Sequence, residues 1–467
     1  MSAQSAPLTE RKYYLPFVLV TSLFFLWAIG VNLNDVLIPH LKKAFELTDF
    51  QSALIQGSFF GGYFLAAFPA GWLMEKIGYK GGIVVGLLIC ATGTLLFLPA
   101  ANSRIYGFFL FALFIMSSGQ AFLEVGANPY VTVLGPSESS ERRLNFAQSF
   151  NAVGAVLVPL LGSAFILSGI EYTHEQRVAM SPQQLNAYIA SEANMVKVPY
   201  IVITCLFLLV AAMIFFAHLP EVQSQEGKGK NDNAGKSSDK ISDHPHLIKG
   251  IIAQFFYVGA QVGVGSFVIR FTKHTMPDTL NKIAARFTGT PIGESSSLFE
   301  RLQAHLTPSN PEKAAALFLV AHQFGFMIGR FFGSAIMKRV SAPKLLSVFG
   351  FGALICVAIG ISVPGLISVL AIVLVGFFNS IMFPTIFALS LKNLGTLTKR
   401  GSSLLVMSII GGGLIPIAMG KISDLSNIRI AFILPFICYA YVTYFALRGY
   451  KTTGEIVVGE EAATSGA

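Results

Sequence analysis

The sequence predicts an all-α polytopic membrane protein in which twelve transmembrane helices form two six-helix bundles. Of its 467 residues, 53% are hydrophobic and only 12% are charged, about half the charged fraction of an average soluble protein. The apolar residues form continuous blocks, each near the ~20 residues that cross a bilayer as a helix. A third observation, internal repetition, divides these blocks into two sets of six.

Twelve apolar spans are expected, and their continuous rather than alternating hydrophobicity predicts helices and not barrel strands. In order, they cover 14–40, 52–75, 81–100, 105–134, 144–168, 198–219, 248–272, 314–337, 345–363, 366–391, 401–422 and 428–447. The stretch between the sixth and seventh spans is polar and rich in Gly, Ser and Lys, which is typical of a linker. We therefore expect an N-terminal six-helix bundle over 1–220, a cytoplasmic linker over 221–247, a C-terminal six-helix bundle over 248–450 and a cytoplasmic tail over 451–467.

The basic residues predict the orientation. With the N-terminus in the cytoplasm, more than half of the 33 Lys and Arg residues fall in cytoplasmic segments, as the positive-inside rule requires. Both termini are therefore placed in the cytoplasm, and this topology accounts for the net charge of +9 without a nucleic-acid partner. The first apolar run is too long for a cleavable signal. No predicted outer segment contains Asn-x-Ser/Thr, which is consistent with a bacterial inner membrane.

The sequence shows no sign of an enzyme, a metal site or a cofactor. The four cysteines lie alone in four different spans and are expected to be small core hydrophobes; they are Cys90, Cys205, Cys356 and Cys438. A phosphate-binding Gly-x-x-x-x-Gly-Lys-Ser/Thr motif is absent, so ATP is not expected to drive the protein directly. A transporter embedded in the lipid bilayer is the favoured class, and a membrane-embedded receptor is the alternative.

The two sets of six spans resemble copies of one unit. Spans five and eleven share an offset, as do spans four and ten, through these pairs: Arg143/Arg400, Gly154/Gly411, Pro159/Pro416, Phe122/Phe377 and Pro129/Pro384. Parallel six-helix repeats around a site at the membrane midplane are the architecture of the major facilitator transporters.

The loop after span two, GWLMEKIGYK, is similar to the major facilitator signature. That pattern is a Gly, an acid four residues later, a base, a Gly and another base. Its positions are filled by Gly71, Glu75, Lys76, Gly78 and Lys80, with Gly81 in place of a further base. We expect the first glycine to allow close helix approach, and the acid with its neighbouring bases to form a conformational lock between the halves. An ordinary basic turn is the alternative.

Further segments resemble the fucose–proton symporter family, which includes bacterial glucose/galactose and N-acetylglucosamine permeases. They are NLNDVLIPHL, LEVGANPYVTVLGP, RLNFAQSFN, FPTIFALSLKNLG and GSSLLVMSIIGGG. The match spans nearly the whole chain in order. The resemblance implies a monosaccharide as substrate and leaves the particular sugar open.

Span four carries a stripe of polar side chains. Because a helix turns ~100° per residue, steps of three, four and four place one set on a single face: Ser117, Gln120, Glu124 and Asn128. Pro129 has no N–H, which leaves the carbonyl of Val125 as a free acceptor. Polar groups at membrane depth are tolerated where they line a cavity or lie within protein. We expect a substrate-facing stripe; a helix–helix hydrogen-bond seam is the alternative, and it explains Glu124 poorly.

Span one adds an aromatic ring beside polar groups. Asn32 and Asp35 share a face, and Trp27 lies about 80° from Asp35 around the helix. This combination suits a sugar, whose C–H faces stack on a ring while its hydroxyls pair with amides. The alternatives are lipid or core packing for Trp27, and a solvated carboxylate at the outer interface for Asp35.

The remaining candidate substrate residues are amides and one aromatic ring. They are Gln148 and Asn151 in span five, Gln261 in span seven, and Asn379 and Phe383 in span ten. Asn379 is the repeat counterpart of Glu124, and no span of the second half contains an acid. In span eight, Arg330 is close enough to the cytoplasmic end to extend toward it. We expect it to form a structural ion pair, with substrate contact as the alternative. His322 is expected to be a packing residue, with a titrating group as the alternative.

Asp35 and Glu124 are thus the two acids embedded in apolar spans, and they are the candidates for ion coupling. A carboxylate in a partly desolvated site can bind and release a proton during a transport cycle. The resemblance implies that acids at these positions serve proton coupling and sugar recognition. It also implies a tyrosine at Phe383 in a fucose transporter, so other hexoses are open.

The sequence therefore predicts a secondary active transporter that imports a monosaccharide with a proton by alternating access. Sodium-coupled symport, with Asp35 and neighbouring oxygens as ligands, is the alternative coupling. A sugar receptor without transport is the alternative class.

Overall fold

The computed structural model is helical over nearly all of the part that it describes, which comprises residues 6–44, 49–103, 105–166, 180–181, 183–184, 197–217, 219–220, 240–287, 303 and 307–452. Within it, the side chains of 33–53 and 159–166 lie outside the description. Ten of the described helical segments are long and apolar enough to cross a membrane. One of them, Leu54–Ser103, contains the second and third predicted spans, and α4 (Ser140–Ile166) coincides with the fifth. Each predicted span is therefore largely helical in its described part.

The first half consists of α4 and four further helices: α1 (Tyr14–Ala44), α2 (Asp49–Ser103), α3 (Tyr106–Val133) and α7 (Lys197–Phe216). The loop predicted between spans two and three is shorter than expected, because α2 runs through both with one break at Gly78. Gly78 has φ of 74°, a conformation that glycine adopts without the steric cost of a side chain. The second glycine of the signature loop thus makes a sharp turn between two long helices.

The second half contains more breaks than the sequence predicts. Its helices are α8 (Pro245–Thr275), α9 (Pro277–Ala284), α11 (Pro311–Ile336), α12 (Ala342–Ser362), α13 (Leu366–Asn379), α14 (Met382–Leu391), α15 (Thr398–Met407), α16 (Gly411–Leu425), α17 (Ile428–Ala431) and α18 (Ile433–Tyr444). The tenth, eleventh and twelfth spans, each expected to be one helix, are all divided, the twelfth at Phe432. The first division precedes Pro384, which cannot donate to the preceding turn, and the second is a 3₁₀ turn, Ser408–Ile410.

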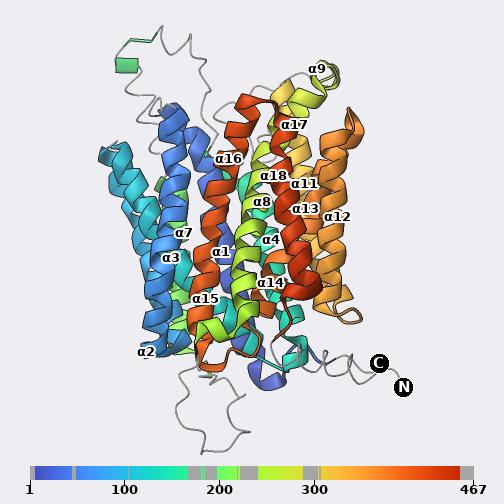
Figure 1. Cartoon of the computed structure of the whole chain (residues 1–467). Helices are drawn as coiled ribbons and strands as arrows, with labels where there is room; N and C mark the ends of the chain where they lie inside the picture. The colour runs from blue at the N-terminus through green and yellow to red at the C-terminus, as the bar shows by residue number, and fades with distance from the viewer. Residues whose placement is uncertain are drawn as a thin grey trace, which may run out of the picture.

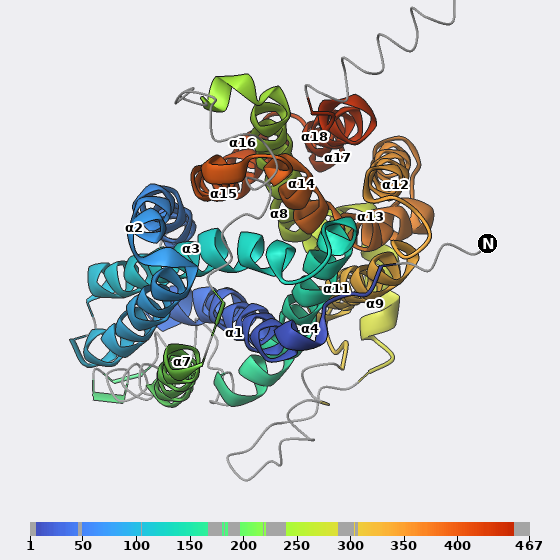
Figure 2. The same cartoon turned by 90° about the horizontal axis from the view of Figure 1, so that it is seen from below.

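The two halves lie side by side. Figure 1 shows the long helices aligned roughly along one common axis. Figure 2 shows α1, α2, α3 and α7 on one side, with α8, α12, α16 and α18 on the other. The halves meet where α4 packs against α11 and α2 packs against α15. At one end of the bundle, called the Gly78 end, Tyr79 contacts Tyr130 with ring centroids 5.8 Å apart, and Thr9 donates to the carbonyl of Leu134 at 2.6 Å.

The outer surface carries large apolar side chains, as expected of a multi-pass membrane protein. Leu65 and Phe216 are 60% and 79% exposed. Cys90, Cys356 and Cys438 are buried as predicted, but the prediction for Cys205 is wrong, because it is exposed. Its helix, α7, lies at the margin of the first half (Figure 2) and therefore presents one face outward.

Candidate functional site

The polar stripe of α3 is buried where the two halves meet. Gln120, Glu124 and Asn128 lie on one face of the helix, and Glu124 is only 1% exposed. Among the described residues, neither carboxylate oxygen of Glu124 has a hydrogen-bond partner, and the amide nitrogens of Gln120 and Asn128 also lack one. Buried polar groups are normally paired. These buried polar atoms are therefore candidates to meet a ligand.

A chain of hydrogen bonds leads from this stripe into the second half. Gln148 on α4 donates from Nε2 to Oδ1 of Asn128 at 2.8 Å. The backbone carbonyl of Gln148 accepts from Nη1 of Arg330 on α11 at 2.7 Å. Arg330 also donates from Nε to the carbonyl of Ser380 at 2.7 Å. One guanidinium thus joins α4 of the first half to the break between α13 and α14 in the second.

The expectation that Arg330 extends toward the end of its span near Lys338 is wrong. Its side chain is 3% exposed and does not extend toward the Gly78 end, because two backbone carbonyls hold it inside the bundle. No direct ion pair joins it to an acid in the described part of the chain. The guanidinium and the Glu124 carboxylate nevertheless attract each other electrostatically. Two opposite charges buried in one region offset part of each other's desolvation cost.

On α1, the structure places Trp27 beside α2 and α3. Its indole Nε1 donates to the hydroxyl of Tyr63 at 2.7 Å, and that hydroxyl donates to Oε1 of Gln120 at 3.4 Å. Asn32 is buried and donates to the carbonyl of Ala28 at 2.8 Å. The side chain of Asp35 lies outside the described residues.

In the second half, Asn379 and Phe383 flank the break between α13 and α14. Asn379 is fully buried, and among the described residues both polar atoms of its side chain lack partners. Its backbone carbonyl accepts from the hydroxyl of Tyr257 on α8 at 2.9 Å. The ring of Phe383 lies 6.3 Å from that of Tyr257. Asn379 thus matches its repeat counterpart, Glu124, in being a polar group buried inside the bundle.

Two candidate residues do not join these contacts. Asn151 donates to the carbonyl of Phe24 at 3.3 Å, which directs its amide toward the backbone of α1. Gln261 is half-buried on α8 and takes part in none of the hydrogen bonds described above. His322 is 3% exposed, and its Nδ1 lies 3.4 Å from the carbonyl of Ile372, in line with the packing role predicted for it.

The carbonyls freed by the two repeat-related prolines are both occupied. Ser402 on α15 donates from Oγ to the carbonyl of Val125 at 2.8 Å, across the boundary between the halves. The carbonyl of Ser380 stands in the same relation to Pro384 and receives Arg330. Proline removes the donor that each carbonyl would have used within its own helix, and a side chain from another helix replaces it.

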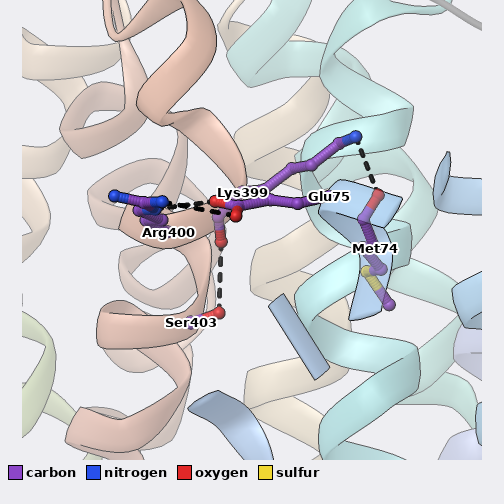
Figure 3. Close-up of polar contacts among 5 residues, drawn as sticks. All are labelled: Met74, Glu75, Lys399, Arg400 and Ser403. Carbon is purple, nitrogen blue, oxygen red and sulfur yellow. Dashed lines mark hydrogen bonds and ion pairs between the residues drawn. The ribbon is translucent and has the colours of Figure 1, made fainter. Parts of the chain in front are cut away.

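The residues of the signature loop meet α15 at the Gly78 end (Figure 3). Glu75 accepts from Nε of Arg400 at 2.7 Å, and Lys399 donates from Nζ to the carbonyl of Met74 at 2.8 Å. A Cβ placed on Gly71 would lie 1.9 Å from Oγ of Ser403. Only a glycine therefore lets α2 approach α15 this closely.

The two bases of the loop contact residues of their own half. Nζ of Lys76 lies 3.7 Å from the centroid of the Trp72 ring, and Nζ of Lys80 donates to the carbonyl of Ala217 at 2.9 Å. The cation that meets Glu75 comes instead from the second half. The sequence marks Arg400 only as the repeat counterpart of Arg143, and nothing in the local spacing pairs Arg400 with Glu75.

Tyr63, Tyr257 and Ser402 were also missed. Each is an unremarkable polar residue in an apolar span, and its partner lies on a helix distant in sequence. The missing N–H of Pro129 did predict a free carbonyl at Val125. A hydroxyl group in a span of the other half, such as that of Ser402, was a possible donor to it.

Comparison with known proteins agrees with this geometry. A family model described as Major Facilitator Superfamily matches residues 20–411. The L-fucose-proton symporter of Escherichia coli is 39% identical over 94% of this chain and 93% of its own length. A glucose/galactose transporter of Brucella abortus is 37% identical over 95% and 96%. The crystal structure of a Major Facilitator Superfamily transporter, FucP, in the outward conformation superposes with a TM-score of 0.78 at 38% identity, covering 95% of this chain and 100% of that one.

Two halves of membrane-spanning helices that meet around a buried carboxylate and buried amide side chains define a secondary membrane transporter. The chain belongs to the Major Facilitator Superfamily and, within it, to the family of the fucose–proton symporter. The relatives reported above are transporters and not enzymes.

Proposed function

We propose that this chain imports a monosaccharide together with a proton, by alternating access between the two sides of a bacterial inner membrane. The observation that carries the proposal is Glu124, a carboxylate that is 1% exposed and has no hydrogen-bond partner among the described residues. A carboxylate costs several kcal/mol in such a place and is retained where its charge has a use. Glu124 and Asp35 are the proposed coupling residues.

The sugar lies, in this proposal, between α1, α3, α4 and the break before α14. Trp27 and Phe383 supply apolar rings, and Gln120, Asn128 and Asn379 supply amide groups that lack a full set of protein partners. Asn32, Gln148, Asn151 and Gln261 complete the proposed set. A phenyl ring at position 383 offers no hydroxyl to the sugar, so we favour a hexose such as glucose or galactose over fucose.

The Gly78 end faces the cytoplasm in this proposal, and both termini lie there. The Glu75–Arg400 pair and the Gly71–Ser403 contact then close the cytoplasmic side, with Lys76, Gly78 and Lys80 shaping the loop that carries them. The two proposed six-helix domains, 1–220 and 248–450, would separate at this end when the sugar is released. The boundary between them, 221–247, falls mostly outside the described residues.

Transport by purified protein in sealed vesicles tests the proposal. A panel of labelled hexoses and deoxyhexoses is offered while pH and sodium are varied separately, and sugar-induced alkalinisation is recorded without sodium. We expect accumulation driven by a pH gradient alone. A strict sodium requirement with no proton signal would replace the proton by sodium, and binding without exchange of labelled sugar would identify a receptor.

A further inference from the structure

Tyr63 is the residue at which three helices of the first half are joined. Its hydroxyl accepts from the Trp27 indole at 2.7 Å and donates to the Gln120 amide oxygen at 3.4 Å. The Tyr63 side chain is 2% exposed, and Trp27 is half-buried. Trp27 lies on α1, Tyr63 on α2 and Gln120 on α3. One phenol thus fixes a ring from the first helix against an amide from the third.

The geometry around Gln120 leaves it little freedom. A Cβ built on Gly30 would lie 2.3 Å from Nε2 of Gln120, so the amide packs directly against the backbone of α1. Glu124 follows one turn later on the same face of α3. Any displacement of Trp27 is therefore transmitted through Tyr63 to an amide that shares a rigid helical face with Glu124.

We propose that Tyr63 is a positioning residue, which orients the Trp27 ring for the sugar and links that ring to the face of α3 that carries Glu124. This inference rests on the proposed sugar transport. Tyr63 itself does not contact the sugar. It acts by holding Trp27 in one orientation, since the phenol oxygen is the acceptor of the indole N–H.

The two tryptophans of the chain make the test direct. Trp72 is 53% exposed in the signature loop, so in a Trp72→Phe background the protein's tryptophan emission reports Trp27 alone. Tyr63→Phe removes one oxygen and keeps the ring. Tyr200→Phe is the matched control, because Tyr200 is 1% exposed on α7 and its hydroxyl has no hydrogen-bond partner in the described part of the chain.

We expect Tyr63→Phe to shift the emission of Trp27 in the absence of sugar, and to raise the KM for sugar uptake about tenfold, the size of one hydrogen bond in a desolvated site. The maximal uptake rate should change much less, and Tyr200→Phe should change neither quantity. Unaltered Trp27 emission and KM in folded Tyr63→Phe protein would overturn the inference. The emission measured without sugar does not depend on transport, so a wild-type protein that transports no sugar would refute the proposed function and leave this part of the test intact.

Discussion

At the scale of single residues, the most informative feature is the position of charge inside the bundle. Glu124 and Arg330 are 1% and 3% exposed and attract each other without direct contact. The guanidinium is held by two carbonyls, whereas no described residue donates a hydrogen bond to the carboxylate. Of these two groups, the Glu124 carboxylate is thus the candidate to meet a ligand or a proton.

Glu124→Gln should uncouple transport. The amide keeps the shape of the side chain but cannot exchange a proton. Exchange of labelled sugar at equilibrium should continue, while accumulation against a gradient should be lost. Counterflow and pH-driven uptake in the same vesicles measure the two activities. Glu312→Gln is the control, since Glu312 is exposed at the start of α11. The Asp35→Asn variant should also fail to accumulate sugar. If both Glu124→Gln and Asp35→Asn accumulated sugar as the wild type does, neither acid would couple transport.

Phe383→Tyr should change which sugar is preferred without abolishing transport. The new hydroxyl would extend from a ring that is 8% exposed beside Tyr257, where it can pair with a sugar hydroxyl. One added hydrogen bond shifts relative uptake about tenfold, measured as the ratio of uptake efficiencies for fucose and galactose. Phe387→Tyr adds the same group one turn further along α14 and is the control. An unchanged ratio in Phe383→Tyr would remove Phe383 from the proposed site.

At the scale of elements, the prolines of α3 and α14 create contacts between helices. Each removes one backbone donor, and the carbonyl left free is taken by Ser402 in the first case and by Arg330 in the second. The Ser402 bond crosses between the halves at a fully buried position. It must therefore break whenever α3 and α15 separate.

Pro129→Ala should make Ser402 less important, because an alanine N–H can again donate to the Val125 carbonyl. In the otherwise wild-type chain, Ser402→Ala leaves that carbonyl unpaired, which should cost about 1–3 kcal/mol of stability. In the Pro129→Ala background the cost should be smaller. Thermal unfolding of the four proteins forms a double-mutant cycle. Ser403→Ala is the control, since its hydroxyl donates within its own helix to Lys399. Additive effects of Pro129→Ala and Ser402→Ala would contradict this account of the two prolines.

At the scale of the whole molecule, the two halves repeat in sequence but not in their contacts. Arg400 extends to Glu75 in the other half. Its counterpart, Arg143, is fully buried within the first half, where it donates to the carbonyls of Val131 at 2.7 Å and Leu8 at 2.9 Å. Arg400 therefore joins the two halves, whereas Arg143 holds together backbone segments at the Gly78 end of its own half.

Breaking the Glu75–Arg400 pair should favour opening at the Gly78 end. The Arg400 and Glu75 side chains are 61% and 29% exposed, and solvent screens such a pair, so the shift should be at most about fivefold. Ser403→Cys, placed in a Cys205→Ala background, reports the opening through its rate of maleimide labelling. Glu75→Gln should raise that rate, and the exchanged pair Glu75→Arg with Arg400→Glu should restore it. Equal labelling rates in the reporter protein, in its Glu75→Gln variant and in its exchanged-pair variant would exclude a lock at this position.

Much of the architecture could be predicted from short-range pattern. Apolar length predicts the helices, because a membrane-spanning segment must satisfy its backbone internally. The offset between Pro129 and Pro384 predicts two related halves, and helical spacing places Gln120, Glu124 and Asn128 on one face. The breaks around Ser380 and within the eleventh span were not predicted, since the energetic cost of a break depends on which side chains from other helices reach the freed carbonyls.

By itself, the sequence determined the class of protein, the repeat and the identity of the embedded carboxylates, because each of these depends on residue type and on separation along one helix. Only the tertiary structure decided the partners. Arg330 donates to the carbonyl of Ser380, Ser402 donates to the carbonyl of Val125, and Arg400 forms an ion pair with Glu75. All three contacts join helices that are distant in sequence. Such pairings depend on how two helices cross and on where a glycine such as Gly71 lets them approach, and no local pattern encodes that geometry.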